Sequence, residues 1–264
     1  MVAIASLQTT VTADPTVEYQ CQANLNLYDS PELKALATQA VAGRQMRILP
    51  LSFQANRHIQ DSAIQDSAGQ DPAAQASVTL AGAVQVVLGE DNYPGWVALE
   101  DLDLLELAEV PYQAIALPAS EIAARLPQVI EFAHSAMRQP NHYLWGGTVG
   151  PNYDCSGLVQ TAFAAAGVWL PRDAYQQEAF VSAVELESLQ PGDLVFFGKS
   201  ERCTHVGMAL GNGQYIHSSG KDQGRNGIGI DRLAADGDLV SQVYFRQLRG
   251  AGRVVECYVP TASR

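Results

Sequence analysis

The segment Tyr143-Leu-Trp-Gly-Gly-Thr-Val-Gly-Pro-Asn-Tyr-Asp-Cys-Ser-Gly-Leu-Val-Gln160 places a cysteine at the start of a helix. Its glycines and proline exclude a helix as far as Asn152, and apolar residues then recur at helical spacing. Cys155 therefore lies in the first helical turn, which Asn152 or Asp154 can cap. Because the unpaired N–H groups at a helix start favour an anion, we expect a lowered pKa for the Cys155 thiol.

The residues next to Cys155 favour a nucleophile, but they do not establish one. Ser156 and Gly157 are small and leave room for an acyl group to approach the sulfur, and the N–H of Cys155 is placed to face a developing oxyanion. A lone cysteine is more often a packing residue, because free cysteines are among the most buried residue types. The assignment therefore depends on partners elsewhere in the chain.

Two predicted strands later in the chain form a β-hairpin. The connection Gly211-Asn-Gly213 is typical of a three-residue loop with a glycine in the left-handed conformation. This register pairs Leu210 with Gln214 and places Gly207 opposite His217. The hairpin therefore determines which side chains share a face of the sheet.

His205 and His217 lie diagonally on one face of this hairpin. Their neighbours Gly207 and Ala209 are small, so we expect the Cys155 helix to approach this face. A base beside a thiol, with a second polar group behind the base, is the general pattern of an activated nucleophile. The opposite face carries an apolar stripe suited to a core, formed by Val206, Met208, Leu210 and Ile216.

Five motifs in this order resemble the NlpC/P60 cysteine peptidases. They are Tyr143-x-Trp-Gly-Gly147, Asp154-Cys-Ser-Gly157, Pro191-Gly-Asp-Leu194, His205-Val-Gly207 and His217. The resemblance covers roughly residues 120 to 258 and implies an α+β fold with a compact papain-like catalytic domain. It also implies that Cys155 is the nucleophile, His205 the general base and acid, and His217 the residue that orients the imidazole.

Members of that family cut cell-wall peptides next to D-glutamate. The resemblance therefore implies an endopeptidase that cleaves the γ-D-glutamyl-L-diamino acid bond of stem peptides with a free N-terminal L-Ala, in cell-wall recycling. It places Arg172 and Asp173 toward the substrate, with the carboxylate receiving the α-ammonium. Asp173 as a helix cap is the open alternative, and Ala174 stands where such enzymes often have Ser. Further pocket residues are Tyr143 near the oxyanion, Trp145 and Ser156.

Other assignments remain open at this stage. Cys203 lies close to His205, but it precedes a strand and has no helix start to activate it. A zinc-binding module that uses Cys155, His205 and His217 is a second alternative, although no paired ligand spacing and no fourth ligand are evident. An amidase or acyltransferase on the same fold and a silent binding module are the others. Cys21 and Cys257 are predicted to fill the core.

The N-terminal part of the chain carries short strand signals. After a tail at residues 1–16, residues 17–110 resemble a small bacterial SH3-like barrel at Leu27-Tyr28 and Gly95-Trp-Val97. Predicted strands lie at 19–27, 47–53, 78–88 and 95–99, a helix lies within 32–42, and a polar insertion lies at about 54–76. Residues 111–119 form the predicted linker to the peptidase domain at 120–264.

The SH3-like domain has two possible roles. It binds wall polymer as a targeting module, or it closes one end of the cleft. The second is favoured because no export signal is evident. In that case Glu90 or Tyr93 reaches the substrate amine, with packing of the turn as the alternative for Tyr93.

Charge and composition exclude several partners. The net charge is −12 and the pI is about 4.7, so nucleic acid is excluded as a partner because phosphate binding needs a basic patch. No run of eighteen apolar residues is present, and we expect a cytoplasmic protein with no membrane partner and free thiols. No cofactor or metal is expected, and the partner is a small murein peptide. The sequence determines neither the preferred diamino acid nor the oligomeric state.

Overall fold

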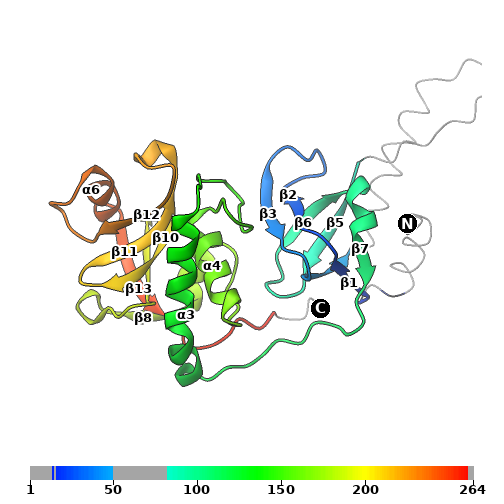
Figure 1. The fold of residues 1–264 in the computed structure, drawn as a ribbon, viewed down its shortest axis with the longest axis horizontal. Helices are drawn as coiled ribbons and strands as arrows, with labels where there is room; N and C mark the ends of the chain where they lie inside the picture. Colours follow the sequence, from blue (N-terminus) through cyan, green and yellow to red (C-terminus); the bar gives the residue numbers. More distant parts are fainter. Residues whose placement is uncertain (1–13, 15, 50–81, 261–264) are drawn as a thin grey trace, which may run out of the picture. The chain divides into compact units, whose positions relative to one another are not determined.

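A computed structural model describes residues 14, 16–49 and 82–260 of the chain. The chain divides into two compact units, Met1–Tyr112 and Gln113–Arg264 (Figure 1). The predicted polar insertion at about 54–76 lies outside the described residues, as does most of the predicted tail.

The N-terminal unit is a seven-stranded antiparallel sheet in the order β3-β2-β6-β5-β4-β1-β7. Its elements are β1 (Glu18–Cys21), β2 (Leu25–Tyr28), β3 (Leu36–Ala40), β4 (Gln45–Ile48), β5 (Ala83–Leu88), β6 (Pro94–Ala98), the 3₁₀ helix η1 (Leu99–Leu104) and β7 (Leu105–Leu107). Among the described strands, no pairing joins β3 to β7. The structure therefore shows a β-rich unit, and the predicted closed barrel is not seen.

The helix predicted within residues 32–42 is wrong. Residues 36–40 instead form β3, which pairs with β2 from Leu25–Ala40 to Tyr28–Leu36. Thr38 and Ala40 are fully buried and alternate with less buried neighbours. Pairing and burial with period two therefore override the helical preference of the alanines. The strand predicted at 19–27 is also interrupted, and forms β1 and β2.

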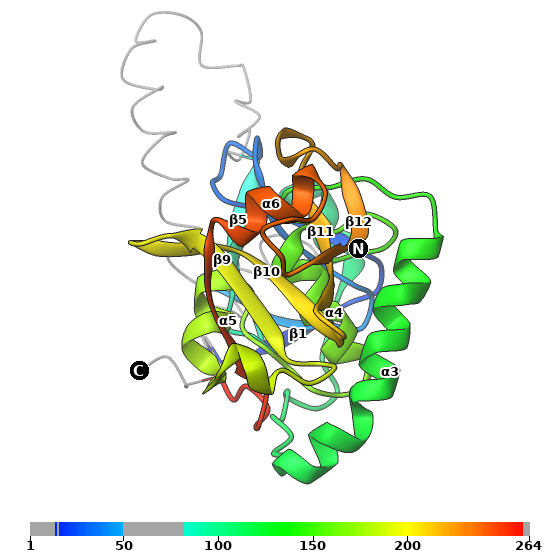
Figure 2. The same ribbon diagram turned by 90° about the vertical axis from the view of Figure 1, so that its left-hand side faces the viewer.

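The C-terminal unit contains a six-stranded antiparallel sheet in the order β12-β11-β10-β9-β13-β8 (Figures 1 and 2). The strands are β8 (Ser182–Val184), β9 (Leu194–Lys199), β10 (Arg202–Gly211), β11 (Gln214–Ser219), β12 (Gly227–Arg232) and β13 (Leu248–Arg253). The helices are α3 (Ala119–Arg138), α4 (Cys155–Ala165), α5 (Ala174–Phe180) and α6 (Leu239–Phe245), with short 3₁₀ turns η2 (Leu186–Ser188) and η3 (Lys221–Gln223).

Two apolar clusters cover the two faces of this sheet. The larger one joins α3 and α4 to the predicted stripe on β10 and β11, with Val206, Met208 and Ile216 buried and Leu210 packed against them. The smaller one lies on the other face and includes Phe197, Tyr215 and Tyr244 of α6. The apolar-stripe prediction is confirmed, and the sheet separates the α4 side from the α6 side.

Pro127 lies inside the single helix α3. A proline in a helix interior costs about 3 kcal/mol. Ile122, Val129 and Ala133 are buried in the larger cluster on both sides of it. The packing of this face offsets the lost hydrogen bond, so one helix continues through the proline.

The β10–β11 turn is tighter than predicted. Gly211 pairs with Gln214, which leaves the two-residue loop Asn212-Gly213, with φ of 52° and 71°. Positive φ at both positions is typical of a type I′ turn, whose twist matches that of paired strands. Leu210 is the extra residue of a bulge, while Met208 pairs with Ile216 in the predicted register. The facing of the histidines is therefore unchanged by the difference in the loop.

Candidate active site

Cys155 is the first residue of α4, and Asp154 caps that helix. Asp154 Oδ1 accepts from the N–H of Gly157 at 2.6 Å, which confirms one of the two predicted caps. The other candidate, Asn152, bonds elsewhere in the preceding loop. Asp154 Oδ2 accepts from the N–H of Gly146 at 2.9 Å. One carboxylate therefore joins the start of α4 to the glycine turn before it.

Arg172 lies behind this turn in a buried ion pair. It donates to Asp154 Oδ2 at 2.6 Å and to Oδ1 at 3.2 Å, and to Ser156 Oγ at 3.0 Å. Arg172 is 2% exposed and Ser156 is 5% exposed. Both side chains have structural partners here, and their contact with a substrate stays a prediction. They support the start of α4, because the buried charge of Asp154 requires a partner.

Glycines allow the Tyr143–Gly147 turn to touch the start of α4. A Cβ on Gly157 would overlap the carbonyl oxygen of Gly147, and a Cβ on Gly147 would lie 2.6 Å from the carbonyl oxygen of Asn152. The sequence predicted that Gly157 leaves space for an acyl group. In the structure it serves this backbone contact instead.

His205 on β10 and His217 on β11 are joined by a hydrogen bond. Nε2 of His205 and Nδ1 of His217 lie 2.7 Å apart, and both side chains are buried. The expectation that the hairpin brings the two imidazoles together is confirmed. Because Nε2 of His205 faces His217, Nδ1 is the ring nitrogen left to act on a thiol.

The predicted approach of the Cys155 helix to the histidine face is wrong. The space at Gly207 is taken by Tyr215, since a Cβ there would lie 2.6 Å from the Tyr215 ring. α4 packs on the opposite face of β10, against the apolar stripe. The Cys155 sulfur lies next to the backbone of β10. The N–H of Val206, the residue after His205, is directed at this sulfur.

Two tyrosines lie near the sulfur. Tyr244 of α6 stacks on His205 with ring centroids 4.2 Å apart and planes inclined by 24°. Its hydroxyl lies 2.8 Å from Ser219 Oγ. Burial raises the pKa of Tyr244 and of Tyr143, and the charge of a Cys155 thiolate raises both pKa values further. Tyr244 therefore covers one face of the His205 imidazole, and both tyrosines lie within electrostatic range of the sulfur.

Burial controls the protonation of the Cys155 thiol. It raises the pKa of Cys155 to about 12, and the charge of Asp154 adds to the rise. The N–H groups of Val206 and Ser156 and the charge of Arg172 oppose it. The lowered thiol pKa predicted from the helix start is therefore wrong, because desolvation outweighs the helix end. Burial also lowers the pKa of His205 well below its usual value, so the resting site holds a thiol and a neutral imidazole.

Asp231 and Arg225 extend the histidine pair, and the sequence reading missed both. His217 Nε2 lies 2.6 Å from Asp231 Oδ2, and Arg225 Nη2 donates to Asp231 Oδ1 at 2.5 Å. The alternation Gly227-Ile-Gly-Ile-Asp231 was an available strand signal directly after the hairpin. It would have placed Asp231 in reach of His217 on the neighbouring strand.

The remaining substrate candidates of the C-terminal unit occupy different environments. Tyr143 is half-buried, and Trp145 is 71% exposed. Asp173 is the N-cap of α5 and forms a capping box with Gln176, whose Oε1 accepts from the Asp173 N–H at 3.0 Å. The capping alternative is therefore present in the structure, and contact of Asp173 with a substrate ammonium stays a prediction.

Glu90 and Tyr93 belong to the N-terminal unit. Glu90 is 5% exposed; it accepts from Arg44 Nε at 3.0 Å and from the N–H of Gln45 at 2.9 Å. Tyr93 packs against the core of that unit. Both have a structural role within the unit, and their contact with a substrate amine stays a prediction.

The other cysteines are buried free thiols. Cys203 is 2% exposed, its sulfur donates to the carbonyl of His205 at 3.3 Å, and burial raises its pKa to about 11. Cys21 and Cys257 are buried, as predicted. Within residues 14, 16–49 and 82–260, no group of three or more His, Cys, Asp or Glu side chains is arranged to hold a metal ion. No helix in the described ranges is long and apolar enough to cross a membrane.

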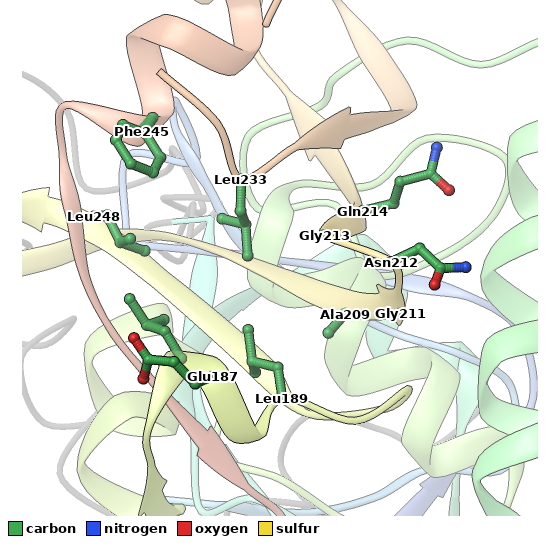
Figure 3. Close-up of a pocket in the computed structure, with 11 residues that line it drawn as sticks. Glu187, Leu189, Ala209, Gly211, Asn212, Gly213, Gln214, Leu233, Phe245 and Leu248 are labelled. Atoms are coloured by element: carbon green, nitrogen blue, oxygen red, sulfur yellow. The ribbon is translucent and has the colours of Figure 1, made fainter. Parts of the chain in front are cut away.

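A hollow of about 290 Å³ lies elsewhere in the C-terminal unit. Figure 3 shows it between η2, the β10–β11 turn and the end of α6, with Leu233, Phe245 and Leu248 among its lining residues. None of Cys155, His205 and His217 lines it. We therefore assign it no part in the chemistry of the cysteine.

Comparisons with known proteins find a family match within the C-terminal unit. Residues 140–249 match the NlpC/P60 family. The chain is 38% identical over 112 residues to a protein named "Probable endopeptidase p60" from Listeria seeligeri, a match that covers 42% of this chain and 19% of that protein. It is 36% identical over 109 residues to the "Gamma-D-glutamyl-L-lysine dipeptidyl-peptidase" of Bacillus subtilis (strain 168), covering 40% of this chain and 36% of that protein.

A solved structure of an NlpC/P60 family protein from Bacillus cereus ATCC 10987 is similar to 94% of this chain and 66% of that chain. The sequence identity is 22% and the TM-score is 0.44. The matched sequence relatives are longer than the region they share with this chain. Residues 140–249 are therefore similar to the NlpC/P60 family, and the two sequence relatives are named as a probable endopeptidase and a dipeptidyl-peptidase.

Proposed function

We propose, from the NlpC/P60 domain at residues 140–249, that this chain is a cysteine endopeptidase. Its substrate is a small peptidoglycan-derived peptide with a free N-terminal L-Ala, cleaved at the γ-D-glutamyl-L-diamino acid bond. Two contacts of strand β10 carry the proposal. His205 is hydrogen-bonded to His217, and the N–H of the next residue, Val206, is directed at the Cys155 sulfur. A thiol, a base and a residue behind the base are the parts of an activated nucleophile.

The first half-reaction begins from the neutral thiol and neutral imidazole. As the sulfur attacks the γ-carbonyl carbon, the thiol proton moves to Nδ1 of His205. The N–H of Cys155, in the first turn of α4, stabilises the oxyanion, and Tyr143, which lies within electrostatic range of the sulfur, assists it. His205 then protonates the amine of the diamino acid, which leaves, and an acyl-enzyme remains on the sulfur.

The second half-reaction uses the same groups in reverse. Nδ1 of His205 accepts a proton from water as the oxygen attacks the thioester carbonyl. The thiolate leaves and is reprotonated, which restores the resting site. The products are L-Ala-γ-D-Glu and a peptide that begins with the diamino acid.

Charge supports a small peptide as the substrate. The chain has a net charge of −12, which repels the intact anionic wall but tolerates a short soluble peptide. The printed name of the Bacillus subtilis relative supports a γ-D-glutamyl bond next to a diamino acid. We place the activity in the recycling of wall fragments in the cytoplasm, with Asp173 as the acceptor of the substrate ammonium.

Incubation of L-Ala-γ-D-Glu-diaminopimelate with the wild type and two variants tests the proposal. Chromatography with mass detection should show L-Ala-γ-D-Glu from the wild type and from Cys203→Ala, and none above background from Cys155→Ala. The N-acetylated tripeptide should be cleaved at least about tenfold more slowly, because its blocked amine cannot pair with a carboxylate. Release of the dipeptide by Cys155→Ala at the wild-type rate would exclude the assignment.

A further inference from the structure

Two charged side chains continue the histidine pair away from the cysteine. The contacts run from His205 Nε2 to His217 Nδ1 at 2.7 Å, from His217 Nε2 to Asp231 Oδ2 at 2.6 Å, and from Asp231 Oδ1 to Arg225 Nη2 at 2.5 Å. The His217 side chain is 0% exposed and that of Asp231 is 1% exposed, whereas that of Arg225 is 26% exposed. A buried carboxylate therefore lies against the second imidazole, and its counter-ion is partly exposed.

The pairing of β11 with β12 builds this arrangement. His217 pairs with Gly229 and Tyr215 pairs with Asp231, so Asp231 lies diagonally from His217 on the same face of the sheet. A Cβ on Gly229 would overlap the guanidinium of Arg225. The glycine opposite His217 thus leaves the space through which Arg225 reaches the carboxylate.

The carboxylate determines which nitrogens carry protons. Asp231 is an acceptor only, so His217 Nε2 must be the donor, which leaves Nδ1 of neutral His217 as an acceptor. His205 must then donate from Nε2, and its Nδ1 keeps a free lone pair. The chain of contacts therefore prepares His205 in the one neutral tautomer that can take a proton from a thiol.

We propose that Asp231, held by Arg225, is a positioning residue of the hydrolysis. It fixes the tautomers of both histidines, and it stabilises on His217 the positive charge that develops while the sulfur attacks the substrate. The inference rests on the proposed function. Asp231 acts through His217 and touches neither the thiol nor the substrate.

The proton steps balance across the two rings. When Nδ1 of His205 takes the thiol proton, the proton on Nε2 of His205 moves to Nδ1 of His217. The cation is then on His217, next to the Asp231 carboxylate, and His205 is neutral again with its proton on Nδ1. Departure of the amine reverses both transfers, since Nδ1 of His205 gives up its proton and His217 returns its Nδ1 proton to Nε2 of His205.

The groups around His217 set the direction of the expected effects. Burial lowers the pKa of His217, and the charge of Arg225 adds to the fall, whereas the hydrogen bond and charge of Asp231 and the charge of Asp238 oppose it. Tyr215 and Tyr244 face the same ring, with centroids 4.8 Å and 4.9 Å away, and their own pKa values are raised. Both are therefore neutral across the pH range of the assay, and Asp231 and Arg225 act on His217 in opposite directions.

The first test measures tautomers without any substrate. Long-range ¹H–¹⁵N correlation spectra of ¹⁵N-histidine-labelled Cys155→Ala protein should show the Nε2–H tautomer for both His205 and His217 at neutral pH. Asp231→Asn in the same background should convert a measurable part of His217 to the Nδ1–H tautomer, because the amide can donate where the carboxylate only accepts. Asp236→Asn, at an exposed residue of the following loop, is the matched control and should leave the tautomers unchanged.

The second test measures the pH dependence of kcat/KM on the tripeptide. Asp231→Asn should lower kcat by about 10- to 1,000-fold, less than the 10⁴-fold known for a carboxylate that directly contacts the catalytic imidazole of a serine protease. The acidic limb of its kcat/KM profile should move to lower pH, because Asp231 no longer raises the pKa of His217. The acidic limb of the Arg225→Gln profile should move to higher pH, because Arg225 no longer lowers that pKa. Arg232→Gln, an exposed neighbour on β12, is the control and should shift neither.

The outcomes separate this inference from the proposed function. If the wild type does not cleave the tripeptide, the proposed function fails, and the tautomer spectra still report on Asp231. If the wild type cleaves it but Asp231→Asn keeps the wild-type kcat, acidic limb and tautomers, the inference is overturned and the function stands. A loss of kcat with unchanged tautomers and an unshifted limb would also overturn it, because it would indicate structural damage alone.

Discussion

The Cys155 sulfur lies at a helix start, yet burial dominates its titration. The sequence correctly placed this residue in the first turn of α4 with Asp154 as the cap. It did not predict the raised pKa, because the residues that bury Cys155 come from other segments of the chain. A helix terminus contributes a fraction of a kcal/mol up to about 2 kcal/mol, less than the desolvation of a buried thiolate.

The protonation of Cys155 makes a prediction about its alkylation. Its pKa of about 12 means that the thiolate fraction keeps rising through the alkaline range. We expect the rate of modification by iodoacetamide to rise about tenfold per pH unit from pH 7 to 10 without a plateau, since the thiolate is the nucleophile. Peptide mapping of Cys155, with Cys155→Ala to account for the other three free thiols, measures it. A plateau reached at or below pH 7 would instead show a preformed thiolate.

The role of Arg172 could not be predicted from the sequence motif alone. A motif places an Arg-Asp pair next to the nucleophile helix, but it does not say which member is buried. In the structure Arg172 pairs with Asp154, and Asp173 caps α5. The difference arises because Asp154, used as a cap, is itself buried and needs a cation.

At the scale of elements, contact between the Tyr143–Gly147 turn and α4 positions the nucleophile. Gly157→Ala should separate them, because its Cβ would overlap the carbonyl oxygen of Gly147. We expect a loss of about 1–3 kcal/mol in the free energy of unfolding, typical of overpacking, together with a lower kcat. Urea denaturation followed by circular dichroism measures the stability.

Gly250→Ala is the matched control for that substitution. Gly250 lies in β13, has no atom within 4 Å of an added Cβ, and has no positive φ. Its substitution should change the free energy of unfolding by less than about 0.5 kcal/mol. Equal stability of the two variants would show that the turn and α4 move apart without cost, which contradicts the close-contact account.

Hairpin elements were the most predictable part of the site. Alternation and a Gly-Asn-Gly turn gave the facing of His205 and His217, and only the loop length differed. The side of the sheet covered by α4 was not predictable in the same way. Gly207 and Ala209 look equally suited to a close helix or to an aromatic ring, and the ring of Tyr215 on the adjacent strand takes the space at Gly207.

In the whole molecule, the α+β fold of the C-terminal unit could be predicted from its sequence motifs. The fold of the N-terminal unit could be predicted only in part. Short strands with turn residues between them predicted an all-β region, and the described residues form a seven-stranded sheet. Closure into a barrel depends on which edge strands pair. Strand signals carry no information on that choice, because pairing partners are set by tertiary contacts.

The proposed mechanism requires a covalent acyl-enzyme on Cys155, which mass spectrometry of the full chain during turnover can detect. The wild type is mixed with L-Ala-γ-D-Glu-diaminopimelate, quenched in acid within the first turnovers and digested. We expect an added L-Ala-γ-D-Glu acyl group on the peptide that contains Cys155, formed as diaminopimelate is released and absent from Cys155→Ala. Two results would contradict an acyl-enzyme on Cys155. One is an acyl group found on Cys203 during release of diaminopimelate, and the other is continued release of diaminopimelate by the Cys155→Ala variant.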